Sequence, residues 1–479
     1  MGSPFRGLDA VYSLDPHPPM TPTRAEQGFA YRQDQFQQIV EDTLALAREL
    51  GASDAGAEVS EGVGLSVSVR KGELENVERN RDKSLGVSVY LGQRRGNAST
   101  SDFSVAALRQ TVQAAYDIAR FTAEDPAAGL PEADDLATPA EVARDLDLFH
   151  PWAIDAAAAA ELARRCEDAA MRVDRRITNS EGAGVSAQQA HFWAGNTRGF
   201  RGGYSSSRHY VSVSPIAKSP GRGGDMQRDG WYTSMRDAAD LAAPEVVGRY
   251  AAERALARLK SRRVPTAEVP VLFESTVAAG LLGAFVQATS GGALYRKTSF
   301  LVDCLGKAVL PKHVDIFEDP HEPKGKGSAP FDDEGVRTQA RQVVQGGSVQ
   351  GYFLSSYSAR KLGMHTTGHA GGSQNLRMTS RRTKAGDSLD AMIAKMGRGL
   401  FVTELMGQGV NYVTGDYSRG AAGFWVEDGH IAYPVQEVTI AGNLRQMFKG
   451  IAAIGADVYT QGSKAVGSVL LGHMKLAGS

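Results

Sequence analysis

The chain has 479 residues, a formal net charge of −1, 42% hydrophobic residues and 22% charged residues. These values are typical of a soluble protein of about two domains, and they exclude a disordered chain and broad electrostatic contact with nucleic acid. No apolar run reaches the ~18 residues of a membrane-spanning helix. The only two cysteines, Cys166 and Cys304, are too few for a disulfide framework, so we expect a cytoplasmic protein without membrane contact.

The first half of the chain predicts an α+β domain over residues 29–242, preceded by an irregular, proline-rich tail over 1–28 that we expect to be disordered. Helices are predicted where apolar residues recur at helical spacing, and strands where they alternate with polar ones. In chain order these are a helix over Asp34–Leu50, strands around 65–69 and 85–91, a hairpin turn at 92–96, a helix from Ser101 or Asp102, an alanine-rich helix over Ile154–Val173, and short strands over 183–236.

A helix from Pro244 to Leu259 and the basic segment that follows it mark a domain boundary, so we assign 243–268 to a helix and linker. Residues 269–479 are expected to form a second domain that is glycine-rich and mainly β. It should begin with a strand over Val269–Phe273 and an apolar helix over Ser275–Thr289. Asp428-Gly429 predicts a hairpin turn, since this pair accepts the positive φ angles of a type I′ turn. The mixed order of elements favours two α+β domains with antiparallel sheet.

Few residues suggest a catalytic or metal-binding role. The motifs G-x-S-x-G and H-E-x-x-H are absent, which removes an ordinary serine hydrolase or zincin. His365 and His369 lie four residues apart, but the glycines around them make a helix that would present both to one metal improbable. Cys304 is expected to be a buried, inert thiol in a strand, and Cys166 a buried thiol within a helix. The acidic run 332–334 is interpreted as a solvated turn rather than a cation site.

One short segment combines small, aromatic and charged residues. Within 414–425 the small residues permit close backbone approach, and the aromatic ones offer an apolar wall. Such a surface would suit an extended peptide along a sheet edge, although a packed loop that supports the hairpin explains the composition equally well. The residues proposed to line a peptide channel are Asp416, Tyr417, Arg419, Phe424 and Trp425.

Several segments together resemble the TldE/PmbA branch of the TldD/PmbA family, whose members were once called modulators of DNA gyrase. No single segment is a chemical signature, but the combination follows the family's order over about residues 30–479. The segments are Gly72–Glu78, Asp145–Pro151, Arg176–Gly182, Tyr295–Lys297, Leu305–Lys307, Pro330–Thr338, Ser356–Gly363, Val402–Val410, Gly415–Glu427 and Val438–Leu444.

The resemblance implies a cytoplasmic zinc protease made of a TldD and a TldE subunit, which degrades unfolded peptides and trims the leaders of peptide precursors. The TldD subunit holds the zinc on an H-E-x-x-x-H helix and a cysteine near its C-terminus. The TldE subunit has a similar fold without these ligands and helps to enclose the substrate passage.

The zinc ligands implied for TldD have no counterpart in this chain. Registering the motif on the strand places Phe273, Glu274 and Ala278 at its H, E and H positions, and registering it on Gly280 places Glu274, Ser275 and Ala279 there. The C-terminal stretch 462–468 contains no cysteine. A catalytic zinc needs three protein ligands and an open position for water. We therefore expect no metal and no catalytic residue in this chain, and zinc in a TldD-like partner.

Three interpretations follow. The first is a partner subunit that shapes the chamber of a heterodimer and forms a homodimer when alone. The second is a complete metalloprotease with a different site, for instance His365, His369 and a carboxylate. The third is a module that binds the gyrase protein without contacting nucleic acid.

Overall fold

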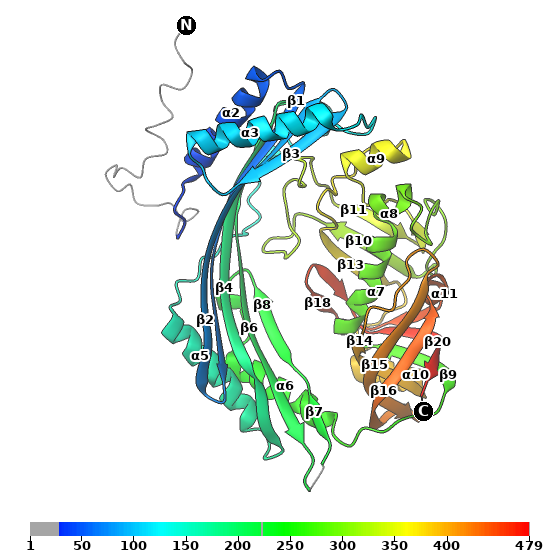
Figure 1. The fold of residues 1–479 in the computed structure, drawn as a ribbon. Helices are drawn as coiled ribbons and strands as arrows, with labels where there is room; N and C mark the ends of the chain where they lie inside the picture. The colour runs from blue at the N-terminus through cyan, green and yellow to red at the C-terminus, as the bar shows by residue number, and fades with distance from the viewer. Residues whose placement is uncertain (1–27, 222–223, 479) are drawn as a thin grey trace.

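The computed structural model describes residues 28–221 and 224–478 (Figure 1). The predicted tail over 1–28 lies outside these ranges except for Gly28. The architecture is α+β, as predicted, with an antiparallel sheet in the first half of the chain and two further sheets in the second. No helix in the described ranges is both long and apolar enough to cross a membrane.

The N-terminal domain is built on one eight-stranded sheet with the order β3-β2-β1-β4-β6-β7, in which β5 also pairs with β4 and β8 with β6. All of its pairings are antiparallel. Its strands are β1 (Asp54–Arg70), β2 (Glu73–Leu91), β3 (Arg94–Thr100), β4 (Ile177–Asn196), β5 (Arg201–Gly202), β6 (Ser205–Lys218), β7 (Met226–Arg228) and β8 (Trp231–Met235).

One face of this sheet carries two separate hydrophobic cores. Near one end, Val59 packs with helices α2 (Gln33–Glu49) and α3 (Val105–Phe121). Near the other end, Val67 packs with α5 (Ala156–Met171) and α6 (Pro244–Ala257). Both valines occupy odd positions of β1, and alternate side chains of a strand point to opposite faces. The even positions of β1 therefore face the other way, toward the concave side that the second domain occupies (Figure 1).

Three short helical segments connect these elements: α4 (Pro139–Val142) and 3₁₀ turns at Ala133–Asp135 and Ala238–Asp240. After α6 the chain crosses to the second domain (Figure 1).

The C-terminal domain contains two six-stranded sheets, with the orders β12-β11-β10-β13-β19-β18 and β16-β15-β14-β9-β20-β17. An additional pairing of β16 with β20 closes five strands of the second sheet into a ring. The strands are β9 (Ala267–Phe273), β10 (Val314–Asp319), β11 (Arg341–Gln345), β12 (Ser348–Val349), β13 (Asn375–Ser380), β14 (Gly399–Met406), β15 (Asp416–Glu427), β16 (His430–Asn443), β17 (Ile451–Ile454), β18 (Tyr459–Gln461), β19 (Lys464–Val466) and β20 (Val469–Ala477).

Helix α7 (Ser275–Ala288) contacts strands of both sheets and contributes Leu282 and Phe285 to the largest core of the molecule. The shorter helices are α8 (Gly291–Tyr295), α9 (Ser356–Leu362), α10 (Leu389–Met396) and α11 (Leu444–Lys449). Because α7 follows β9 directly, its first turn lies at the end of a central strand, close to α6 of the first domain.

The structure confirms several local predictions and corrects others. Asp428 and Gly429 both have positive φ angles, 51° and 74°, as the hairpin prediction required. The helix expected from Ser101 or Asp102 begins instead at Val105, because Ser104 accepts a hydrogen bond from the Ala107 amide and caps it. The strand expected around Cys304 is wrong: residues 300–304 form turns, although the thiol is buried as predicted.

Candidate functional site

The first turn of α7 is occupied by an ion pair between the two domains. Glu274 precedes the helix, is 7% exposed, and accepts two hydrogen bonds from the Arg254 guanidinium of α6, at 2.7 and 3.3 Å. The Thr276 hydroxyl donates a third, at 2.7 Å. A bidentate arginine–carboxylate pair is among the strongest polar contacts in proteins. The Glu274 carboxylate is therefore saturated by donors from the chain itself.

Further charges extend this network. The Arg254 Nε atom lies 3.4 Å from Asp229, and Arg258 contacts both Asp229 and Glu404, at 3.5 and 2.5 Å. Burial opposes the charged form of Arg254, but Glu274 and Asp229 outweigh it and raise the pKa of its guanidinium. The guanidinium also lies over the Trp231 ring, 5.2 Å from its centroid. Arg254 is thus a fixed cation at the junction of the domains.

The other positions that correspond to the zinc motif are closed. Phe273 and Ala278 are fully buried and Ala279 is 5% exposed, all within the largest core. The C-terminal stretch 462–468 forms a turn at Gly462 followed by β19 and contains no cysteine. Within the described residues, no group of three or more His, Cys, Asp or Glu side chains could hold a metal ion. These residues do not fit a zinc ion.

The structure does not bring His365 and His369 together as a metal site. His369 is 6% exposed; its Nε2 atom lies 2.9 Å from Glu318, and its Nδ1 atom lies 2.9 Å from the Thr367 hydroxyl. His365 is exposed. Burial opposes ionisation of Glu318, but His369 and Arg341 lower the pKa of its carboxyl. His369 therefore belongs to a buried polar network, and the alternative of a metal site built on this histidine pair has no geometric support.

Of the five residues proposed to line a peptide channel, Tyr417 and Arg419 lie together against α7. Asp416 is exposed and accepts hydrogen bonds from Thr414 and Asn443. The other two lie farther along β15. Phe424 packs on Phe401, with 6.1 Å between ring centroids, and Trp425 donates a hydrogen bond to Glu427.

Tyr417 and Arg419 line a cavity of about 110 Å³, which we call the α7–β15 cavity. Its remaining wall is mostly apolar and comes from α7, from the end of β9 and from the segment after β14, with the residues Phe273, Val277, Gly280, Leu281, Ala284, Leu405, Gln408, Val410 and Tyr412. The packing of segment 414–425 against α7 was not predicted. The available signal was the alternation in β15, which places Arg419 on the same face as the buried Tyr417 and Ala421.

A second cavity, of about 660 Å³, lies between the concave face of the first sheet and residues 331–335 of the second domain. We call it the interdomain cavity. Its wall includes the aromatic side chains of Tyr90, Tyr204 and Phe331. It also includes the carboxylates of Glu58 and Asp333, whose pKa values are raised mainly by burial. Sequence reasoning missed this cavity, because its two walls are far apart in the chain.

The acidic run beside this cavity is a turn, as predicted, with Asp333 exposed, but Asp332 is buried rather than solvated. Asp332 is 5% exposed and accepts hydrogen bonds from the backbone amides of Glu334, Val336 and Ala370, each at 2.9 Å. Burial raises the pKa of Asp332 from 3.8 to about 7, although these amides oppose the shift. Asp332 therefore organises the turn from inside, and its neighbours face the cavity.

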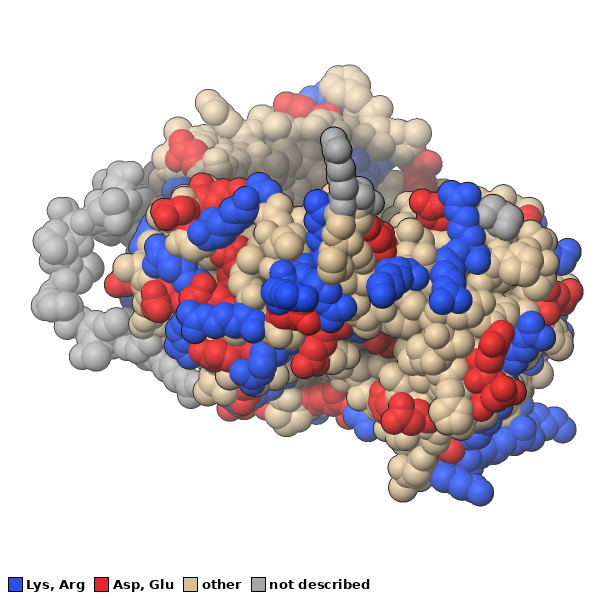
Figure 2. All heavy atoms as spheres, turned by 90° about the horizontal axis from the view of Figure 1, so that it is seen from below, with Lys and Arg blue, Asp and Glu red and all other residues tan. Residues whose placement is uncertain are grey.

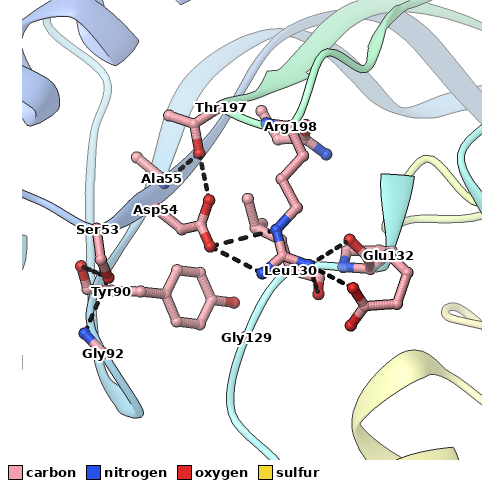
Figure 3. A network of polar contacts seen from close by, with 12 residues as sticks. Ser53, Asp54, Ala55, Tyr90, Gly92, Gly129, Leu130, Glu132, Thr197 and Arg198 are labelled. Carbon is pink, nitrogen blue, oxygen red and sulfur yellow. Dashed lines mark hydrogen bonds and ion pairs between the residues drawn. The ribbon is translucent and has the colours of Figure 1, made fainter. Parts of the chain in front are cut away.

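A polar network fixes the outer wall of the interdomain cavity (Figure 3). The Arg198 guanidinium pairs with Asp54 at 3.1 Å and with Glu132 at 3.0 Å, and the Thr197 hydroxyl donates to Asp54 at 2.8 Å. From the second domain, Arg360 of α9 donates to the Gly129 carbonyl at 3.0 Å. The segment 129–132 is thus tied to both domains. On the face shown in Figure 2, acidic and basic side chains are interspersed without a stripe of one sign.

Known proteins of one family are similar to this chain in sequence and fold. Models of the PmbA/TldA metallopeptidase domain 1, central domain and C-terminal domain match residues 56–119, 149–259 and 266–478. The chain is 50% identical to the metalloprotease PmbA of Escherichia coli O157:H7 over 92% of this chain and 96% of that protein. A crystal structure of a proposed modulator of DNA gyrase from Bacteroides thetaiotaomicron superposes with a TM-score of 0.86 at 25% identity, covering 94% of this chain and all of that one. TldE from Thermococcus kodakarensis gives a TM-score of 0.77 at 18% identity, covering 91% of this chain and 99% of that one.

Proposed function

The chain belongs to the PmbA/TldD metallopeptidase family, and from this premise we propose that it is the metal-free, TldE-type subunit of a cytoplasmic zinc protease. In this proposal a TldD-like partner holds the zinc, and this chain shapes the passage through which unfolded peptides and peptide precursors reach it. The chain makes no covalent contribution to peptide hydrolysis.

The state of the α7 N-terminus carries this proposal. A metalloprotease needs a glutamate that is free to accept a proton from a metal-bound water. In this chain the corresponding Glu274 is held by Arg254, and the flanking Phe273 and Ala278 are fully buried. This arrangement supports the interpretation that α7 was retained for packing between the domains rather than for binding a metal.

The proposal is tested by expressing the chain alone and together with a TldD-like family member that bears H-E-x-x-x-H. We expect a heterodimer with one zinc ion per pair, and cleavage of unfolded peptides only when both chains are present. Glu274→Gln should leave cleavage intact, whereas the same change in the partner's motif should abolish it. Stoichiometric zinc in the chain alone, with cleavage of an unfolded peptide, would contradict the proposal.

A further inference from the structure

Arg419 is a charged residue on the inner face of a barrel strand. From Tyr417 to Ala421, β15 pairs with β16 in regular register, so residues 417, 419 and 421 point to the same side. Tyr417 and Ala421 are 5% and 0% exposed and belong to the largest core. The Arg419 side chain therefore points toward α7, where apolar residues would be expected.

No acidic group in the described part of the chain balances this charge. The Nε atom of Arg419 is buried and has no hydrogen-bond partner, and none of the ion pairs among the described residues includes this side chain. The groups that face it are the phenols of Tyr412 and Tyr417. Burial raises the pKa of Tyr417 to about 12, so both phenols remain neutral near pH 7 and can donate hydrogen bonds. The Arg419 side chain is half-buried, and its Nε atom is fully buried. A cation in mostly apolar surroundings without a counter-ion destabilises a protein, which points to a counter-ion supplied from outside.

The cavity has the size and shape for a single small group. Its volume is about 110 Å³, and Val277, Leu281 and Ala284 of α7 form an apolar floor. The segment after β14 folds over β15 as a cover: the Gly409 carbonyl accepts a hydrogen bond from the Ser418 amide at 2.7 Å. A side chain at Gly409 would approach the Ser418 carbonyl oxygen to 1.8 Å, so only glycine fits there. At Gly280, by contrast, a Cβ atom would meet nothing within 4 Å.

We propose that the α7–β15 cavity binds one carboxylate of a peptide, with Arg419 as its counter-ion and the Tyr412 and Tyr417 phenols as neutral donors. A carboxylate on a short apolar stem matches a cavity that has one cation and an apolar floor. The carboxylate belongs either to the C-terminus of the peptide or to an Asp or Glu side chain. The inference rests on the proposed function, because it assumes that peptides pass along α7.

Three fluorescein-labelled peptides with one neutral core sequence separate these sources. The first has a free C-terminus and no acidic residue, the second is amidated and carries one Glu, and the third is amidated with Gln in place of that Glu. Binding to the full chain is followed by fluorescence anisotropy. We expect the first or the second peptide to bind about tenfold to a hundredfold more tightly than the third, as a charge-assisted hydrogen bond predicts. Equal affinity for all three would overturn the inference.

Variants then assign the effect to Arg419. Arg419→Met should reduce the affinity for the preferred carboxylate peptide to that for the third peptide and leave the third unchanged. Arg419→Lys retains the charge but loses the planar fork. Its affinity for the preferred carboxylate peptide should therefore lie between those of the wild type and of Arg419→Met. Arg263→Gln is the control, since it removes a cation of the adjoining linker at an exposed pair with Glu437 of the second domain, and it should change nothing. An equal loss for all three peptides in Arg419→Met would indicate a structural role and overturn the inference.

Stability gives a second readout that a structural arginine would not produce. Because Arg419 has no counter-ion among residues 28–221 and 224–478, Arg419→Met should raise the thermal unfolding midpoint while it weakens peptide binding. A lowered midpoint would contradict the inference. Failure of the proposed function has a different outcome: the wild-type chain, alone and with its zinc-bearing partner, would then bind none of the three peptides.

Discussion

Two charged groups beside α7 lie in opposite surroundings. At the start of the helix, Glu274 is paired with Arg254 and hydrogen-bonded by Thr276. Beside the middle of the helix, Arg419 faces two phenols and no acid. The first group has all the partners that it needs within the chain, and the second does not. The difference separates a charge that holds the two domains together from a charge that is available to a ligand.

The comparison also shows why the start of α7 is unsuited to a metal cation in this chain. A guanidinium already occupies the neighbourhood of Glu274, and a metal would have to displace it while gaining no histidine ligand. At Arg419 the sign is reversed, and the cavity is suited to an anion. The chain therefore presents a positive charge to a peptide, whereas a metal-binding carboxylate would present a negative one.

The largest expected effect comes from breaking the paired group. Arg254→Met would leave the buried Glu274 without its counter-ion and Asp229 with Arg258 alone, and removal of one partner of a buried pair costs about 3–5 kcal/mol. Urea unfolding should show this loss. Arg249→Met, at an exposed position of the same helix, should change the unfolding free energy by less than about 0.5 kcal/mol. Similar effects of the two substitutions would refute the distinction.

Asp332 sharpens the comparison, because its buried carboxylate accepts hydrogen bonds from backbone amides and forms no ion pair with a cation of the described residues. Its folded-state pKa, about 7, lies above the ordinary 3.8, so the folded chain holds this proton longer than the unfolded chain. Its contribution to stability is therefore fully present below about pH 4 and is lost as the pH rises to about 7, with a slope of at most about 1.4 kcal/mol per pH unit. Unfolding free energies measured across this range should fall more steeply with pH in the wild type than in Asp332→Asn, which retains only the smaller contributions of groups such as Glu58 and Asp333. The same slope in both proteins would show that another group titrates.

The histidine pair gives the smallest expected effects. His369→Ala should cost about 1–3 kcal/mol, because Glu318 would lose a buried partner. His365→Ala should change stability by less than about 0.5 kcal/mol, since the side chain is exposed. Chemical denaturation in the presence and absence of a chelator measures both. If both substitutions lowered the unfolding free energy equally, and did so only without chelator, the metal-site alternative would be supported again.

Local patterns in the sequence predicted much of the fold, and distant contacts accounted for most of what was missed. The helices α2 and α7 and the hairpin at Asp428-Gly429 followed from apolar patterning and turn chemistry. The first half of β2 was missed because 73–83 carries polar and charged residues on both faces of an exposed strand. The Glu274–Arg254 pair and the interdomain cavity join segments that only tertiary structure brings together, so no local pattern encodes them.

The closed ring of strands has a consequence for how the protein is made. β20 is the last strand that the structure describes, and it closes the ring by pairing with β16 and with β9, which is synthesised about two hundred residues earlier. Until β20 has left the ribosome, both strands retain an unpaired edge, the feature through which incomplete domains aggregate. A chain that ends at residue 466 should therefore be cut by protease throughout 267–466 while its N-terminal domain stays protected. Protection of both domains in that chain would show that the barrel forms without its last strand.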